Sequence, residues 1–355
     1  MRDAGIDRAK GLLILLVVLG HMAGGVRFTL GESGFAILDQ AYIGINLFHM
    51  AAFFFLAGFW RTRNEHGRTF GAFVAGKARR LLVPYVFWGV ASAVVFVALG
   101  SALGLVTGGV GYYEARGSEA VSGWQPFVSL LHAGGWPRGE GFRCNSVLWF
   151  LPAMFVTSIF HEALTRVRGW GNGILPCAAA LGCFALAGVL RLANVDGLPW
   201  GLAVVPWYLG FMVLGGLAGR RVDGAGRGVV AFGAAALIGI CCWWSDLGLG
   251  WRSIAWYAAH LGVAVLGSWV CVVGVRGWRC GWLEWLGAES LGIMVLHKFF
   301  VLACQVGCRQ VRGQAPDAVM VVAAVVLAVG VAGACGALSR GVRRKIGRAS
   351  CRERV

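Results

Sequence analysis

Residues 10–27 read KGLLILLVVLGHMAGGVR, and only Leu, Ile, Val and Gly lie between Lys10 and His21. This run predicts an α-helix in which the eleven steps from Lys10 to His21 make just over three turns, with an angular offset of about 20° and an axial separation of about 16 Å. Both side chains then lie on one side of the helix, and in a bilayer Lys10 lies near the surface while His21 lies near the middle. Because ionisable groups inside a span are costly and usually functional, the pair is a candidate functional site.

The composition sets the fold class. Apolar residues make up 58% of the 355 residues, and charged residues make up 14%. Such a chain has too much apolar surface for a water-soluble fold, and its runs of about 20 apolar residues have the length that a bilayer core requires. The runs are continuous instead of alternating, which favours helices over a β-barrel. We therefore predict an all-α protein, a polytopic integral membrane helical bundle.

About ten transmembrane helices are expected. The first run has no cleavage site of the A-x-A type and is followed by nine others, so we interpret it as a retained first helix and not as a signal peptide. The predicted spans are residues 11–27, 41–60, 81–105, 147–165, 173–193, 202–219, 228–247, 254–275, 286–305 and 318–338.

The loop charges predict the orientation. With the N-terminus in the cytoplasm, 20 Lys and Arg residues fall on the cytoplasmic side and eight on the other. The positive-inside rule favours this arrangement, with both termini cytoplasmic, in a multi-pass protein of the cytoplasmic (inner) membrane, most consistent with a bacterial cell. The net charge of +16 then follows from membrane topology and attraction to the lipid bilayer, and it implies no nucleic acid partner. Nothing in the sequence defines an oligomeric state.

The chain is expected to form one transmembrane domain over residues 1–345. Residues 346–355, IGRASCRERV, resemble the translation of a sequencing adapter, and we interpret them as a non-native tail. The longest external segment, about residues 108–145, is rich in Trp, Tyr, Glu and Arg. It is interpreted either as a carbohydrate-binding or lid element or as an aromatic belt at the membrane interface.

Four histidines inside the predicted spans are candidates for chemistry. Counting along the helices places His21, His49 and His297 near mid-bilayer, where they can converge on one cavity, and His260 nearer the outside. A packing role is favoured for His260. A metal site is not expected, because H-x-x-x-H and H-E-x-x-H patterns are missing from the sequence and carboxylates are scarce in the spans. A neutral imidazole suits general-base chemistry on a hydroxyl, since it titrates near neutral pH.

A second cluster of cations precedes the third predicted span. Lys77, Arg79 and Arg80 stand directly before LLVPY. Basic residues at this position usually fix topology, yet Lys and Arg also donate charge-assisted hydrogen bonds to phosphate. The residues alone leave both interpretations open.

Five strings in order resemble the membrane acyltransferase-3 family, and its fucose-4-O-acetylase-like branch in particular. The first is GIDRAKG followed by LLILLVVLGH, in which a basic residue and a histidine are separated by ten positions. The others are FHMAAFFFLAGF at residues 48–59, KARRLLVPY at residues 77–85, LWFLPAMF at residues 148–155 and LGAESLGIMVLH at residues 286–297. The resemblance extends over nearly the whole chain.

The resemblance implies an O-acyltransferase that uses acyl-CoA, commonly acetyl-CoA, as co-substrate. The acyl group would pass to a hydroxyl of a sugar, polysaccharide or other cell-envelope acceptor, without a metal. By position, Lys10 and His21 match the family's basic-x10-His motif, and Lys77 and Arg80 match its basic-x-x-basic motif. We expect His21 and Lys10 to be catalytic, and Lys10, Lys77, Arg79 and Arg80 to bind the CoA phosphates. His49, His297 and Trp149 are expected to line the substrate cavity.

The role of His21 and the class of protein each have alternatives. His21 either deprotonates the acceptor hydroxyl or carries the acyl group transiently. Lys10 is too far from His21 for a direct hydrogen bond, which favours cofactor binding for Lys10. A multi-span transporter or exporter of an envelope glycan or small solute, or a non-catalytic subunit of an envelope complex, would also have many spans and intramembrane ionisable residues.

Overall fold

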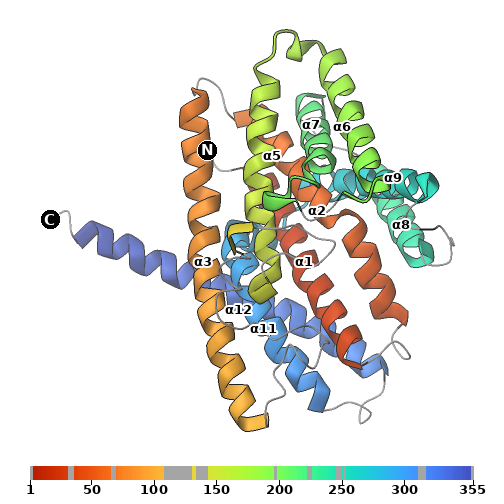
Figure 1. Ribbon diagram of the computed structural model, residues 1–355. Coiled ribbons are helices and arrows are strands. Elements are labelled where there is room, and N and C mark those ends of the chain that lie inside the picture. The colour runs from red at the N-terminus through yellow and green to blue at the C-terminus, as the bar shows by residue number, and fades with distance from the viewer. Residues whose placement is uncertain are drawn as a thin grey trace. The chain divides into compact units, whose positions relative to one another are not determined.

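The computed structural model describes residues 3–30, 36–64, 69–107, 130–132, 143–195, 198–221, 226–244, 250, 253–310 and 317–352. Every regular element in these ranges is a helix, as predicted (Figure 1). The external segment around residues 108–145 lies largely outside the described residues, as do the last three residues of the predicted tail. The helices fall into two compact units, which we describe separately.

Unit 1 comprises residues 1–63 and 215–355. Its helices come from both ends of the chain, and α1 packs against α10, α11 and α12. The elements are α1 (Ala4–Leu30), α2 (Ala36–Asn64), the end of α7 (Val205–Arg221), α8 (Arg227–Trp243), α9 (Ile254–Val272), η6 (Gly274–Gly277), α10 (Gly281–Ala288), α11 (Ser290–Gln310) and α12 (Asp317–Arg352).

Unit 2 comprises residues 64–214. In it α3 packs against α5 and against the short η2 helix, and α6 packs against η3. Its elements are α3 (Phe70–Thr107), η2 (Arg143–Trp149), α5 (Phe150–Thr165), η3 (Trp170–Asn172), α6 (Ile174–Leu192), η4 (Pro199–Gly201) and the first part of α7.

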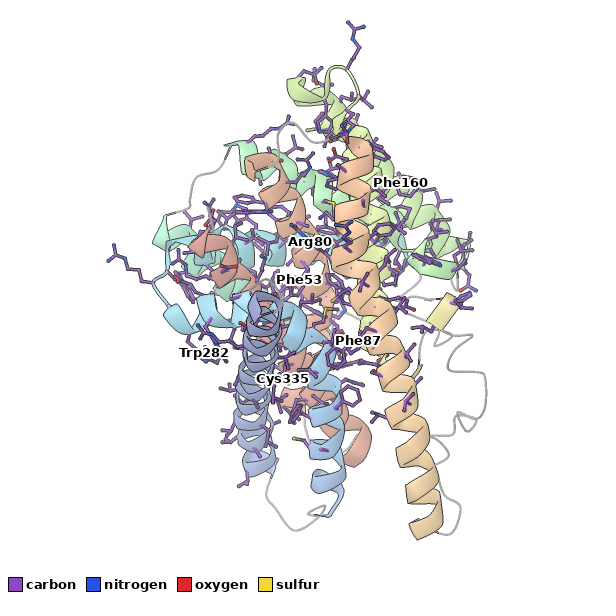
Figure 2. The ribbon with its side chains drawn as sticks, turned by 90° about the vertical axis from the view of Figure 1, so that its left-hand side faces the viewer. Phe53, Arg80, Phe87, Phe160, Trp282 and Cys335 are labelled. Atoms are coloured by element: carbon purple, nitrogen blue, oxygen red, sulfur yellow. The ribbon has the colours of Figure 1, made fainter. Side chains whose placement is uncertain are left out.

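Within the described residues, seven helices are long and apolar enough to cross a membrane. Each of the ten predicted spans overlaps a helix, so the total of ten stays a prediction, as does the orientation of the termini. The seven are Leu38–Thr62, Phe70–Val95, Asn145–Thr165, Ile174–Leu192, Pro199–Arg220, Ile254–Gly277 and Val322–Val342. Large apolar side chains such as Phe87 on α3 and Phe160 on α5 are exposed on these helices (Figure 2), as expected for surfaces that meet lipid.

The predicted span 286–305 is not one continuous helix. It begins inside α10, and the helix is interrupted at Glu289 before α11 starts. The backbone N–H of Glu289 donates to the carbonyls of Trp285 and Leu286, which closes the last turn of α10 tightly. The buried Glu289 carboxylate accepts a hydrogen bond from the Ser339 hydroxyl of α12 at 2.8 Å. This hydrogen bond joins the interruption between α10 and α11 to α12.

Two glycines bring α1 and α10 to backbone contact. A side chain at Gly11 would collide with the carbonyl oxygen of Leu283, and one at Gly287 would collide with the carbonyl oxygen of Asp7. Each helix therefore uses a glycine to admit a carbonyl of the other, which is how small residues allow close helix crossing. The crossing sets the axial position of α1, the helix that carries Lys10 and His21.

Charged side chains also join the first turns of α1 to α10 and η6. Arg8 Nη1 donates to Glu284 Oε1 at 2.6 Å, and Arg8 Nη2 donates to the backbone carbonyl of Arg276 at 2.7 Å. Asp3 Oδ1 accepts from the backbone N–H groups of Gly5 and Ile6 and caps the helix. Asp3 also lies 3.7 Å from the guanidinium of Arg276.

We expect Arg8→Met to lower the free energy of unfolding by about 1–3 kcal/mol, because a mostly buried charged donor with two partners is lost. Glu284→Gln and the double variant complete a double-mutant cycle, in which we expect a coupling of about 0.5–3 kcal/mol. Thermal melts of the purified protein measure both quantities. The exposed Arg279 of the same unit supplies the control, Arg279→Met, which should melt like the wild type. A coupling near zero would show that the pair does not stabilise the fold.

Candidate active site

The first helix places Lys10 and His21 as the spacing predicts. Since α1 is continuous from Ala4 to Leu30, the two side chains lie about 16 Å apart along the same side of it. Lys10 Nζ lies 3.7 Å from Asp7 Oδ1, one turn earlier, and its side chain is 39% exposed. His21 is half-buried. The two residues therefore meet different surroundings, a charged helix end and the interior of unit 1.

Two of the other predicted histidines, His49 and His297, lie near His21. The ring centroids of His21 and His297 are 5.2 Å apart, with an interplanar angle of 35°. His49, His297 and the ammonium group of Lys298 all interact electrostatically with the His21 imidazole. Helices α1, α2 and α11 thus contribute one histidine each to a single cluster, which we call the histidine cluster: His21, His49, His297 and Lys298.

Backbone carbonyls hold two rings of the histidine cluster. Nδ1 of His49 lies 2.7 Å from the carbonyl of Ile45, and Nδ1 of His297 lies 3.0 Å from the carbonyl of Ile293. A carbonyl oxygen only accepts hydrogen bonds, so each Nδ1 carries the proton in the neutral ring and Nε2 carries the lone pair. The described residues contain no group of three or more His, Cys, Asp or Glu placed to hold a metal ion. The chemistry available to the cluster itself is proton transfer and nucleophilic attack.

His260 has the packing role that was favoured for it. Its Nε2 lies 2.9 Å from the carbonyl of Leu47, which joins α9 to α2. Its ring also packs edge-on against Trp256 at 4.7 Å and Trp244 at 6.4 Å. These contacts distinguish His260 from the histidine cluster and make it a suitable control residue.

The predicted phosphate-binding residues lie on α3, in unit 2. Arg79 and Arg80 are exposed, and Lys77 is half-buried with its ammonium group 5.4 Å from the centroid of the Phe73 ring (Figure 2 labels Arg80). The Lys77 ammonium group lies over an aromatic ring, so Arg79 and Arg80 are the more accessible cations of the three.

Trp149 also lies in unit 2, at the junction of η2 and α5. Its ring is half-buried and lies 5.8 Å from the ring of Tyr208 on α7 and 6.4 Å from that of Phe150. The proposed part of Trp149 in a substrate cavity stays a prediction.

Sequence reasoning missed two groups. Lys298 directly follows His297, and its position in the middle of a predicted span could have identified it. The other group lies on α5, where His161 and Glu162 are both buried and Glu162 accepts two hydrogen bonds from Arg166, at 2.7 and 3.0 Å. His161 lies within the predicted span 147–165, and this position is the signal by which the sequence could have identified it.

Comparison with known proteins now assigns the chain to a class. The sequence model of the acyltransferase-3 family, described as "Acyltransferase domain", matches residues 3–337. This range contains every residue of the histidine cluster and the cations of α3. The chain therefore belongs to the acyltransferase-3 family, as the ordered sequence strings predicted.

Two curated relatives match part of the chain. Nodulation protein NolL of Sinorhizobium fredii and nodulation protein NolL of Mesorhizobium japonicum are each 33% identical over 87 residues. The match covers 24% of this chain and 23% of either relative, so it extends over about a quarter of both proteins. No solved structure matches the chain.

Proposed function

We propose that the protein is a membrane O-acyltransferase that moves an acyl group, acetyl in the simplest case, from acyl-CoA to a hydroxyl of a sugar, polysaccharide or other cell-envelope acceptor. The histidine cluster carries this proposal. It gathers imidazoles from three helices of an acyltransferase-family chain, where proton transfer to or from a hydroxyl is the required chemistry.

In this proposal His21 is the reacting residue of α1. Its imidazole either removes the proton of the acceptor hydroxyl or accepts the acyl group before passing it on. Lys10 lies about three turns away, so it does not touch the same atoms. We assign Lys10 to the acyl donor, for which an ammonium group at the helix end is a suitable partner.

The cations of α3 are assigned to the phosphates of acyl-CoA. Arg79 and Arg80 present exposed guanidinium groups, whose planar donors match phosphate geometry, and Lys77 adds a point charge. The cytoplasmic supply of acyl-CoA requires this end of α3 to face the cytoplasm. That is the orientation favoured by the distribution of basic residues, with both termini cytoplasmic in the inner membrane of a bacterium.

Arg79→Ala and Arg80→Ala are each expected to raise the KM for acetyl-CoA by about tenfold and to leave kcat within about twofold, because each loses a charge-assisted bond to phosphate. Initial rates of CoA thiol release at varied acetyl-CoA concentrations measure both constants. Arg168→Ala is the matched control, since Arg168 is an exposed arginine of the same unit without a proposed role. Unchanged KM values in both variants would remove the phosphate assignment and leave the arginines as topology determinants.

The function itself is tested with the full chain in lipid nanodiscs. We expect labelled acetyl from acetyl-CoA to appear in envelope glycans with stoichiometric release of CoA, and mass spectrometry of glycans from cells with and without the gene to differ by acetyl groups. Solute flux without consumption of acetyl-CoA would instead indicate a transporter or exporter and would overturn the proposal.

A further inference from the structure

One atom of the histidine cluster has no partner. Nε2 of His297 is buried and makes no hydrogen bond with any described residue, and the side chain as a whole is 0% exposed. Buried polar atoms of folded proteins are nearly always hydrogen-bonded, so an exception calls for a physical explanation. Either the atom is a packing defect or it is kept free for a group that arrives during function.

The partner of the other ring nitrogen defines what the free atom can do. Nδ1 of His297 donates to the carbonyl of Ile293 at 3.0 Å, so in the neutral ring Nε2 is an acceptor with its lone pair directed away from the α11 backbone. An acceptor of this kind binds an O–H or N–H group and can take its proton. A metal would need further ligands, and the described residues supply no such group.

His21 and Lys298 are the neighbours of the His297 ring in the histidine cluster. The His21 ring lies 5.2 Å away between centroids, yet no hydrogen bond joins the two rings, so His21 does not occupy the lone pair. Lys298 is the next residue along α11 and acts electrostatically on His21.

We propose that Nε2 of His297 is the atom that binds the acceptor hydroxyl and takes its proton. This inference rests on the proposed function and deepens it. As the hydroxyl oxygen bonds to the acyl carbon, its proton passes to Nε2 of His297. The leaving atom is a nitrogen of the acylated His21, which departs with the bonding pair and receives that proton. In the step before, that nitrogen takes the acyl group from acyl-CoA, and the departing CoA sulfur receives the proton that the His21 ring gives up. Of the two roles proposed for His21, this assignment leaves the transient acyl carrier.

Two substitutions separate this role from a structural one. His297→Gln keeps an acceptor oxygen near the position of Nε2 but cannot take a proton, so we expect kcat to fall at least about 100-fold while the KM for the acceptor stays within about threefold. His297→Leu removes the unpartnered atom while keeping an apolar side chain, so we expect transfer to be lost and the melting temperature to stay the same or rise. His260→Gln is the matched control, because His260 is a histidine of the same unit held by packing and by a backbone carbonyl.

The experiment uses the full chain in nanodiscs with acetyl-CoA and methyl glycosides of common envelope sugars as acceptors. CoA thiol release gives kcat and KM, and thermal melts are recorded on the same samples. Wild-type turnover together with a His297→Gln variant that keeps kcat within about threefold would overturn the inference alone. A His297→Leu variant that keeps its turnover and melts about 5 °C or more below the wild type would also overturn the inference alone. That combination is expected when a residue stabilises the fold and takes no part in the reaction. A wild type that consumes no acetyl-CoA with any acceptor would overturn the proposed function and this inference with it.

Discussion

His21→Ala is expected to lower the kcat of acetyl transfer at least about 100-fold, with the protein still folded. The substitution removes the imidazole that the proposal makes the acceptor of the acyl group. A positioned histidine contributes a factor of roughly 10²–10⁴ to a rate. Because His21 is half-buried and its ring is not hydrogen-bonded to that of His297, the fold loses little when the ring is removed. Purified variants in nanodiscs, assayed by thiol release and by thermal melts, separate the two effects.

The control for His21→Ala is a histidine of the same unit that has no proposed part in the reaction. His260→Ala removes a ring of the same unit that packs on two tryptophans, and we expect its kcat to stay within about threefold of wild type. Lys10→Met should change the KM for acetyl-CoA more than kcat, because Lys10 is assigned to the donor. Near-normal turnover by His21→Ala would end the catalytic assignment of His21.

Gly287→Val is expected to be the most destabilising single change, lowering the free energy of unfolding by about 3 kcal/mol or more. Its Cβ would collide with the Asp7 carbonyl, and a backbone carbonyl cannot turn aside as a flexible side chain can. Helix α10 would have to move off α1, which would also disturb the Arg8–Glu284 ion pair. The yield of monodisperse protein in size exclusion and its melting temperature measure the loss.

Gly281→Val provides the matched control on the same helix. A Cβ at Gly281 meets no atom within 4 Å, so the substitution adds the same side chain without a collision. We expect its melting temperature to stay close to that of wild type. If Gly287→Val behaved like Gly281→Val, the backbone contact between α1 and α10 would be wrong.

The helical class was readable from the sequence because membrane spans are specified by long apolar runs, which involve many residues at once. The interruption at Glu289 was not readable, and neither was the hydrogen bond that its carboxylate accepts from Ser339, fifty residues away along the chain. The close contact between α1 and α10 was not readable either. The sequence contains 56 glycines, and only packing shows that Gly11 and Gly287 each face a carbonyl.

The sequence predicted which histidines of the candidate site lie at one depth, but not how their rings are hydrogen-bonded. Depth along the helices brought His21, His49 and His297 to one level, and the structure gathers them together. Counting residues cannot say which ring nitrogen is free, because that depends on the carbonyls of Ile45 and Ile293 one turn earlier. Lys298 is not a histidine, so the pattern of intramembrane histidines does not include it.

The contact at Gly11 and Gly287 constrains how a catalytic cycle can proceed. With a carbonyl of each helix seated in the other, α1 cannot slide or rotate on α10 by one residue without steric collision. The contact therefore fixes the axial position of α1, the helix that carries His21, relative to α10. A movement of His21 along the axis of α1 during turnover would therefore have to carry α10 with it.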